Sequence, residues 1–344
     1  MKSSHRFFVC GGGTGGHFFS GVALAELFLK LHPEGDVFFV GTRYGIEARY
    51  ELKDSRMKKL FILSKGVKGK SILDKIFALC LIFCGIFQSI GFLIRYRPTI
   101  VAGVGGYASA PTVFAAVLLR WLFRWKVFVL DQNSSPGLVN KIFSRFPLNA
   151  YCAFPFKGFQ LVDLPLRQSF LESANQRRSS SWPAQTILVL GGSQGAKGLN
   201  DRWIGLLPQL KQAFPNLKVL HQTGKADEDR VRLAYQSVGL VAEVFAFSDD
   251  MPRLYSASDL VVCRAGAMSV FEVLAFNKPA IFVPFPKAAD DHQTKNALSV
   301  QVSGWVLSEQ QLSWERLYSL LNCESPAIPA RSSRPDRDWT QILS

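Results

Sequence analysis

Several residue patterns that define large protein classes are missing from this chain. Its six cysteines form no CxxC pair and several lie in apolar runs, so we interpret them as buried thiols in a reducing compartment. The apolar part of the N-terminal stretch MKSSHRFFVCGGG is too short for a signal peptide, which predicts a cytoplasmic protein. No zinc-knuckle or RNP-type pattern is present, and we therefore expect no nucleic acid partner.

Acidic residues are also scarce. The chain has 26 Asp and Glu residues against 40 Lys and Arg residues, which gives a formal net charge of +14. A basic surface predicts an anionic partner, and without nucleic-acid patterns this means a phosphorylated substrate or an acidic membrane. The length of 344 residues predicts two domains, each large enough for its own core.

The stretch 259–297 carries the most informative pattern. An apolar strand, Leu260–Cys263, is followed by a glycine turn, a helix over Met268–Phe276 and a second strand over 280–285. This order is half of a doubly wound α/β sheet, in which ligands bind outside the carboxyl ends of the strands. Helix N–H groups after Gly266 suit a phosphate, and the Glu272 carboxylate suits two ribose hydroxyls. The alternative is that Glu272 is a solvated helix residue.

A polar loop follows this second strand and ends at the head of another helix. His292 and Gln293 in that loop offer neutral donors and acceptors, which together with Glu272 suit a sugar nucleotide. The alternative is that they only begin the helix. Asp290 and Asp291 precede them, and we interpret these two acids as helix caps and not as a metal site.

The N-terminal half follows the same plan. A strand over 6–10 leads into GGGTGGH, a helix from about Ser20 to Leu31 and a strand over 37–40. The glycines fit GxGxxG, but the acid that binds an NAD ribose is missing where Gly41-Thr42-Arg43 stands. Arg43 would suit a 2′-phosphate, so an NADP-dependent oxidoreductase remains an alternative. Further polar groups follow later strands, at 105–109 and at 131–133.

The plan restarts after a polar, proline-bearing stretch at 175–184. A strand over 186–190, the glycine turn GGSQGA and a helix from about Leu199 repeat the design. We expect a first domain over 1–165 and a second over 166–344, Rossmann-like and facing each other across a cleft. We also expect a short helix over 339–343 to pack back on the first domain.

The most apolar stretch is 76–94, which is about long enough to span a bilayer. Basic residues flank it within 65–97, and a similar mixture of basic and aromatic residues recurs at 120–126. We favour peripheral attachment to an anionic membrane surface over spanning. A buried helix that covers the sheet is the remaining alternative.

Eight motifs in order resemble the MurG family, the N-acetylglucosaminyltransferases of peptidoglycan synthesis with the GT-B fold. The motifs are GGGTGGH (11–17), GVGGYASAP (103–111), DQNSSPGLVNK (131–141), GGSQGA (191–196), HQTG (221–224), DDM (249–251), CRAGAMSVFE (263–272) and DHQTKNA (291–297). The resemblance implies inverting transfer of GlcNAc from UDP-GlcNAc to lipid I, the undecaprenyl-pyrophosphoryl-MurNAc-pentapeptide, which gives lipid II. It implies no cofactor and no metal. It also implies a peripheral position on the cytoplasmic face of the inner membrane, with other cell-wall synthesis proteins as partners.

The resemblance also implies roles for individual residues. In the second half, Glu272 would hold the ribose, and Arg264 with the backbone near Ser248 would frame the uracil. The other donor contacts would come from Thr14, Gly15, Gly16, Asn133, Arg167, Ser193, Gln194, Gly195, Gly266, Ala267, Met268, His292 and Gln293. In the first half, the acceptor pyrophosphate would meet Gly13, Gly16, Gly105, Gly106 and Tyr107.

The acceptor hydroxyl needs a general base. His17 is our first candidate and Asp131 the second, with Asn133 beside the reacting centre. His17 has the alternative role of a hydrogen-bond donor to phosphate, and Asp131 that of orienting Asn133. The chain departs from the family where Asp131 replaces a Glu and Leu164 replaces an Asn, so a non-catalytic lipid-bound carrier or scaffold also remains open.

Overall fold

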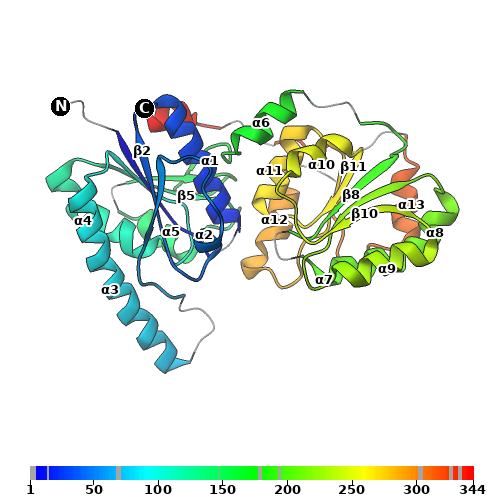
Figure 1. The fold of residues 1–344 in the computed structure, drawn as a ribbon, viewed down its shortest axis with the longest axis horizontal. Coiled ribbons are helices and arrows are strands. Elements are labelled where there is room, and N and C mark those ends of the chain that lie inside the picture. The colour runs from blue at the N-terminus through cyan, green and yellow to red at the C-terminus, as the bar shows by residue number, and fades with distance from the viewer. Residues whose placement is uncertain are drawn as a thin grey trace. The chain divides into compact units, whose positions relative to one another are not determined.

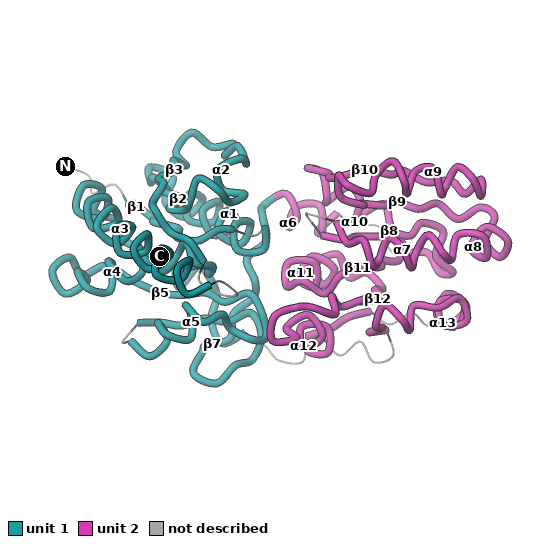
Figure 2. The backbone as a smooth tube through the Cα atoms, turned by 90° about the horizontal axis from the view of Figure 1, so that it is seen from below, with its two compact units in different colours: residues 1–168, 334–344 teal, residues 169–333 magenta. Residues whose placement is uncertain are grey.

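The chain forms two compact units in the computed structural model, which describes residues 5–13, 15–66, 71–146, 148–176, 180–192, 195–300, 305–324, 328–331 and 335–344. Unit 1 comprises Met1–Gln168 and Arg334–Ser344, and unit 2 comprises Ser169–Ser333 (Figure 2). The division falls three residues after the predicted boundary at residue 165, and the C-terminal end of the chain belongs to unit 1.

Unit 1 contains a seven-stranded parallel sheet of order β3-β2-β1-β4-β5-β6-β7 among its described residues. The strands are β1 (Arg6–Cys10), β2 (Asp36–Gly41), β3 (Met57–Phe61), β4 (Ile100–Gly103), β5 (Lys126–Asp131), β6 (Asn149–Cys152) and β7 (Gln160–Leu161). Side chains alternate across β1, so Phe7 and Val9 pack on one face while Phe8 and Cys10 pack on the other. Both faces are buried, which explains why the central strands are continuous apolar runs.

Helices cover both faces of this sheet (Figure 1). One face carries α1 (Gly15–Leu31), α2 (Ile46–Arg49) and the terminal helix α14 (Trp339–Leu343), whose Trp339 packs against Phe128 and Tyr151. The other face carries α3 (Ile72–Tyr96), α4 (Ala110–Phe123) and α5 (Leu138–Phe143). Helix α1 begins at Gly15 and not near Ser20 as predicted, because glycine has a low helix propensity that conceals the first turn in the sequence.

Unit 2 contains a five-stranded parallel sheet of order β10-β9-β8-β11-β12 among its described residues. The strands are β8 (Thr186–Leu190), β9 (Lys218–Gln222), β10 (Val241–Phe245), β11 (Leu260–Cys263) and β12 (Ala280–Phe282). The helices are α6 (Gln168–Asn175), α7 (Lys197–Gly205), α8 (Leu207–Ala213), α9 (Glu228–Val238), α10 (Met251–Ala257), α11 (Ala267–Phe276), α12 (His292–Leu298) and α13 (Trp314–Leu321), with a 3₁₀ turn at Ala289–Asp291. The two α/β units confirm the predicted fold class.

Helix α3 is long and apolar enough by composition to cross a membrane, and only 22% of its most apolar window is buried. One face packs on unit 1 through Ala78, Gly85, Ser89 and Leu93, while large apolar side chains on the rest of the helix are exposed. The prediction that the cysteines are buried is therefore wrong for Cys80 and Cys84, which lie exposed on this helix. Trp125 of the second basic and aromatic cluster is buried, stacked on Phe123.

Candidate functional site

In unit 1, the two glycine loops at the carboxyl ends of β1 and β4 lie in direct backbone contact. A Cβ on Gly11 would lie 2.8 Å from the carbonyl oxygen of Gly105, and a Cβ on Gly106 would lie 2.6 Å from that of Gly12. Gly13, Gly105 and Gly106 have φ of +85°, +95° and +78°, in the left-handed region that favours glycine. Glycine is therefore required in these loops both because their backbones lie close together and because φ is positive.

His17 lies beside this pair of loops, in the first turns of α1. A Cβ on Gly105 would lie 2.9 Å from His17 Nε2, so the imidazole packs directly against the second loop. Tyr107 of the same loop packs against Gly13, whose Cβ position lies 3.3 Å from Tyr107 Cε1. Thus the predicted acceptor residues Gly13, Gly105, Gly106 and Tyr107 share one edge of the sheet with His17. Gly15 and Gly16 form the start of α1, and Thr14 lies outside the described residues.

Asp131 ends β5 at the same edge and organises its own loop. It is buried, and its carboxylate accepts hydrogen bonds from the Asn133 amide (3.0 Å), the Gly137 amide (2.7 Å) and Asn140 Nδ2 (2.9 Å). Both carboxylate oxygens accept hydrogen bonds from this loop, and this geometry favours the orienting role over that of a general base. Asn140 was not predicted as a site residue, and its Nδ2 also donates to the Leu130 carbonyl at 3.0 Å.

Gln132 is buried between the glycine loops. Its Nε2 donates to Ser20 Oγ (2.9 Å) and to the Val104 carbonyl (2.7 Å), which ties α1 to the loop after β4. Arg167 lies farther along unit 1, with its guanidinium 4.8 Å from the centre of the Phe19 ring on α1. Arg167 is predicted to contact the nucleotide, and its guanidinium is stacked on an aromatic ring of α1.

In unit 2, the glycine loop after β8 packs on the loop after β9. Gly195 has φ +77°, and a Cβ there would lie 2.1 Å from the Thr223 carbonyl oxygen. Its amide donates to the Gly192 carbonyl at 2.9 Å. Any side chain at Gly195 would push the two loops apart. Ser193 and Gln194 lie outside the described residues.

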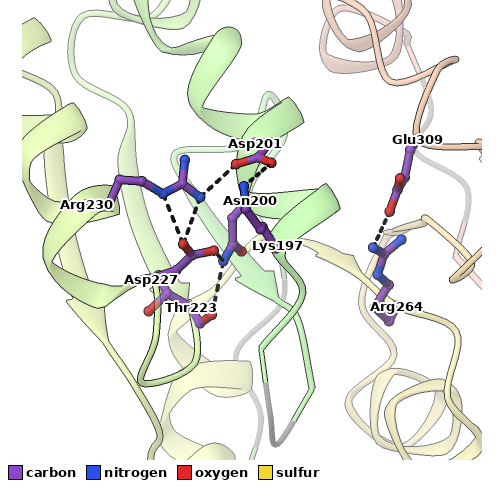
Figure 3. Close-up of polar contacts among 8 residues, drawn as sticks. All are labelled: Lys197, Asn200, Asp201, Thr223, Asp227, Arg230, Arg264 and Glu309. Carbon is purple, nitrogen blue, oxygen red and sulfur yellow. Dashed lines mark hydrogen bonds and ion pairs between the residues drawn. The ribbon is translucent and has the colours of Figure 1, made fainter.

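A polar network with a buried centre at Asn200 and His221 supports the Thr223–Gly224 loop (Figure 3). Asn200 Nδ2 donates to the Thr223 carbonyl (3.0 Å) and to Asp227 Oδ2 (2.8 Å), and Arg230 pairs with Asp227 and Asp201. Asn200 Oδ1 faces His221 Nε2 at 3.2 Å, and Tyr235 Oη lies 3.0 Å from His221 Nδ1. Because Asn200 Oδ1 only accepts, Nε2 carries the His221 proton and Nδ1 accepts from Tyr235.

We expect His221 to make unit 2 sensitive to acid. Burial lowers the pKa of His221 to about 3 from 6.5, so the unfolded chain takes up a proton between these values and the folded chain does not. The contribution to the free energy of unfolding is full above pH 6.5 and declines as the pH falls toward 3, by up to about 5 kcal/mol. Urea unfolding at pH 7, 6 and 5 measures this loss. His221→Gln, which does not titrate, should show a smaller slope with pH, and equal slopes would contradict the assignment.

The glycine turn between β11 and α11 leads into the helix that carries Glu272. The helix begins after Gly266, with no side-chain cap and no acid in its first turn. The amides of Ala267 and Met268 therefore form the positive end of the helix dipole, and no acid of that turn neutralises it. Glu272 Oε2 accepts a hydrogen bond from Tyr255 Oη at 2.9 Å. Burial and the Glu272 charge raise the pKa of Tyr255 well above its usual value, so this hydroxyl keeps its proton and donates it. Tyr255 was not predicted from the sequence.

Arg264 is directed into unit 2. Its Nη1 donates to the carbonyls of Val283 and Pro284, both at 3.1 Å, and its Nη2 pairs with Glu309 (Figure 3). The side chain is buried, and its Nε has no partner among the described residues. Both Nη atoms are thus held by unit 2 itself, so contact with uracil through the backbone of this turn is the simpler arrangement.

The predicted sugar contacts His292 and Gln293 form the first turn of α12 and do not lie in the loop before it, because that helix begins at His292. His292 Nδ1 lies 2.7 Å from the Ala289 carbonyl, and Gln293 Oε1 accepts from the Phe285 amide at 2.9 Å. Asp291 occupies the N-cap of α12, but its carboxylate accepts from Thr294 Oγ1 (2.7 Å) and makes no side-chain cap. The predicted capping hydrogen bond is therefore not made by Asp291, and both Asp290 and Asp291 have positive φ.

Two further features bear on site chemistry. Ser248 Oγ accepts from the Asp250 amide (3.2 Å), and Asp250 caps α10 through the Arg253 amide (3.3 Å). Within the described ranges, no group of three or more His, Cys, Asp or Glu side chains lies close enough to hold a metal ion. Unit 2 therefore offers helix amides and one fixed carboxylate to a ligand, and unit 1 offers two glycine loops and an imidazole.

Comparison with known proteins agrees with this division into units. Models of the glycosyltransferase family 28 N-terminal and C-terminal domains match residues 7–152 and 186–328. A relative from Citrifermentans bemidjiense is 43% identical over 98% of this chain and 96% of its own length. One from Geobacter sp. is 42% identical over 98% and 92%. Both are named UDP-N-acetylglucosamine–N-acetylmuramyl-(pentapeptide) pyrophosphoryl-undecaprenol N-acetylglucosamine transferase.

Solved structures give the same result for the fold. MurG from Acinetobacter baumannii superposes with a TM-score of 0.69 at 31% identity, covering 92% of this chain and 89% of that one. A UDP-glucose:anthocyanidin 3-O-glucosyltransferase in complex with UDP superposes with a TM-score of 0.57 at 11% identity, which shows a shared fold alone. It covers 94% of this chain and 91% of its own.

Proposed function

Since this chain belongs to the MurG family of glycosyltransferase family 28, we propose that it transfers GlcNAc from UDP-GlcNAc to lipid I to give lipid II, with inversion at the anomeric carbon. The observation that carries this proposal is sequence identity above 40% over nearly the whole chain, including both units. The NADP-dependent oxidoreductase has no comparable support, and Arg43 stacks 5.6 Å from the centre of the Phe61 ring.

Unit 2 is proposed to bind the donor. Glu272 accepts hydrogen bonds from the ribose hydroxyls, and the amides at Ala267 and Met268 face the diphosphate. The Gly195 loop meets the same diphosphate, while His292 and Gln293 contact the GlcNAc hydroxyls. As the C1–O bond breaks, UDP gains negative charge that helix N-terminal amides stabilise without reorganisation.

Unit 1 is proposed to bind the acceptor. The loops at Gly105–Tyr107 and at the start of α1 receive its pyrophosphate, and His17 takes the proton from the attacking hydroxyl. The Asp131 carboxylate accepts a hydrogen bond from the Asn133 amide and so holds Asn133 at the same edge of the sheet.

Turnover tests the proposal directly. Purified protein is incubated with UDP-GlcNAc and a short-chain analogue of lipid I, and both UDP and the disaccharide product are quantified. We expect equimolar UDP and product, with the β-anomer formed from an α-linked donor. Binding of both substrates without product would support the carrier or scaffold instead.

The exposed side of α3 is proposed to attach the protein to the cytoplasmic face of the membrane. Ile72, Leu73, Phe77, Phe83 and Phe87 are each more than half exposed, as are Leu118, Trp121 and Leu122 of α4. Basic residues lie beside them in the sequence, namely Lys65, Lys75, Arg95, Arg97, Arg120, Arg124 and Lys126. Lys68 and Lys70 lie outside the described residues. Since the opposite side of α3 packs on the sheet, we favour lying on the surface over crossing the bilayer.

We expect the double variant Phe83→Ser, Phe87→Ser to weaken binding to vesicles that contain phosphatidylglycerol at least about tenfold, because two buried aromatic contacts with lipid are lost. Vesicle sedimentation measures it, with phosphatidylcholine vesicles to isolate the role of charge. Leu233→Ser is the matched control, since Leu233 of α9 is 64% exposed in unit 2. Equal loss in both variants would contradict a surface specific to α3.

A further inference from the structure

Glu47 is a buried carboxylate with a full set of hydrogen bonds, at the start of α2 in unit 1. It is 2% exposed. Its Oε1 accepts from the Thr42 amide and the Thr42 hydroxyl, both at 3.0 Å, and its Oε2 accepts from the Gly13 amide at 2.9 Å. One side chain therefore joins the loop after β2 to the glycine loop after β1, across 34 residues of sequence.

Three glycines leave room for this carboxylate. A Cβ on Gly12 would lie 2.4 Å from Glu47 Cδ, and one on Gly45 would lie 2.0 Å from Oε2. A Cβ on Gly41 would lie 2.6 Å from Glu47 Cγ. These glycines belong to two different loops, so both loops are shaped around the same acid. A carboxylate that was only a solvated helix residue would need none of this space.

The glycine loop held by Glu47 leads directly into α1. Gly12 contacts Gly106 through its carbonyl, and Gly13 packs on Tyr107. The Gly13 amide points back to Glu47, so it does not face a ligand in this arrangement. Any displacement of Gly13 would shift the contact with the second loop and the start of the helix that carries His17.

We propose that Glu47 is a positioning residue for sugar transfer, which fixes the Gly11–Gly13 loop and through it the place of His17 beside Gly105. The effect of Glu47 on catalysis rests on the proposed function, whereas its role in holding the Gly11–Gly13 loop does not. Glu47 itself touches neither substrate. The chain has no acid directly after β2, where a dinucleotide fold binds ribose, and the acid that follows is turned onto the protein's own loop.

Glu47→Gln tests the proposal with almost no change in volume. The new amide places N–H donors against either the Gly13 amide or the Thr42 donors, so one side of the network is lost. We expect kcat to fall at least about tenfold, because a buried donor is left unsatisfied and the loop relaxes. The KM for UDP-GlcNAc should stay unchanged. Deuterium exchange of a peptide that contains Gly13 should become faster.

Asp259→Asn is the matched control. Asp259 is also a buried carboxylate that accepts backbone hydrogen bonds, from Ser181, Gln185 and Thr186, and it lies at the amino end of β11. We expect this variant to lose thermal stability while kcat per folded molecule is retained. Glu47→Asp, one methylene shorter, should keep a charge but fail to reach both loops, and it provides a second test if Glu47→Gln does not fold.

Two results would overturn the proposal. One is that folded Glu47→Gln has the kcat of the wild-type protein. The other is that Glu47→Gln and Asp259→Asn lose activity to the same degree for a given loss of stability. If the wild-type protein shows no turnover, the proposed function fails instead. The exchange rate of the Gly13 peptide then still decides whether Glu47 holds the loop.

Discussion

Glu272→Ala is expected to raise the KM for UDP-GlcNAc by about 10- to 100-fold, with a much smaller change in kcat. The reason is that the variant loses charge-assisted hydrogen bonds to the ribose, each worth about 1.5–3 kcal/mol. The ribose is remote from the breaking bond, so the interaction is equally strong in the ground state and the transition state. Steady-state kinetics with the acceptor analogue at saturation measure both constants.

Tyr255→Phe and a modified donor sharpen this test. Removing the Tyr255 hydroxyl leaves Glu272 in place but frees its Oε2 from the 2.9 Å hydrogen bond, so we expect a smaller rise in KM. A 2′-deoxy donor should bind the wild-type protein more weakly and should bind Glu272→Ala without a further loss, because the two changes remove the same contact. Additive losses would show that Glu272 does not hold the ribose.

The central strands of both sheets could be predicted because they are buried on both faces. Arg6–Cys10 and Leu260–Cys263 are apolar runs with glycine turns behind them, which is the pattern of parallel strands. By contrast, β3, β6 and β7 were not predicted. Strands β3 and β7 form the two edges of the unit 1 sheet, where Met57–Phe61 carries two lysines and Gln160–Leu161 has two residues. Because an edge strand of a sheet is less completely buried, its sequence shows no continuous apolar run. Strand β6 has only four residues and begins with the polar Asn149.

The site divides in a similar way. Residues that follow strands, such as His17, Gly105 and Asp131, could be placed at one edge from the sequence, because parallel strands share their carboxyl ends. Glu47 and Tyr255 could not be found, since each acts through a partner 34 or 17 residues away in a different element. The sequence shows which residues meet the edge of the sheet, and long-range contacts decide how they are held.

His17→Ala is expected to lower kcat by about 10²- to 10⁴-fold, the usual contribution of a general base, while the KM for UDP-GlcNAc changes little. Steady-state kinetics with both substrates measure the two constants. A variant with an unaltered kcat would remove His17 as the base and leave it as a hydrogen-bond donor to phosphate.

Asp131→Asn separates this assignment from its rival. The Asp131 carboxylate accepts three hydrogen bonds within its own loop, so the variant places an amide N–H against those donors and should lose stability together with activity. A base at Asp131 would instead show an intact fold and a kcat as low as that of His17→Ala. Because the carboxylate is already held by three hydrogen bonds from its own loop while the imidazole of His17 lies beside Gly105, the geometry favours His17 as the group that takes the proton.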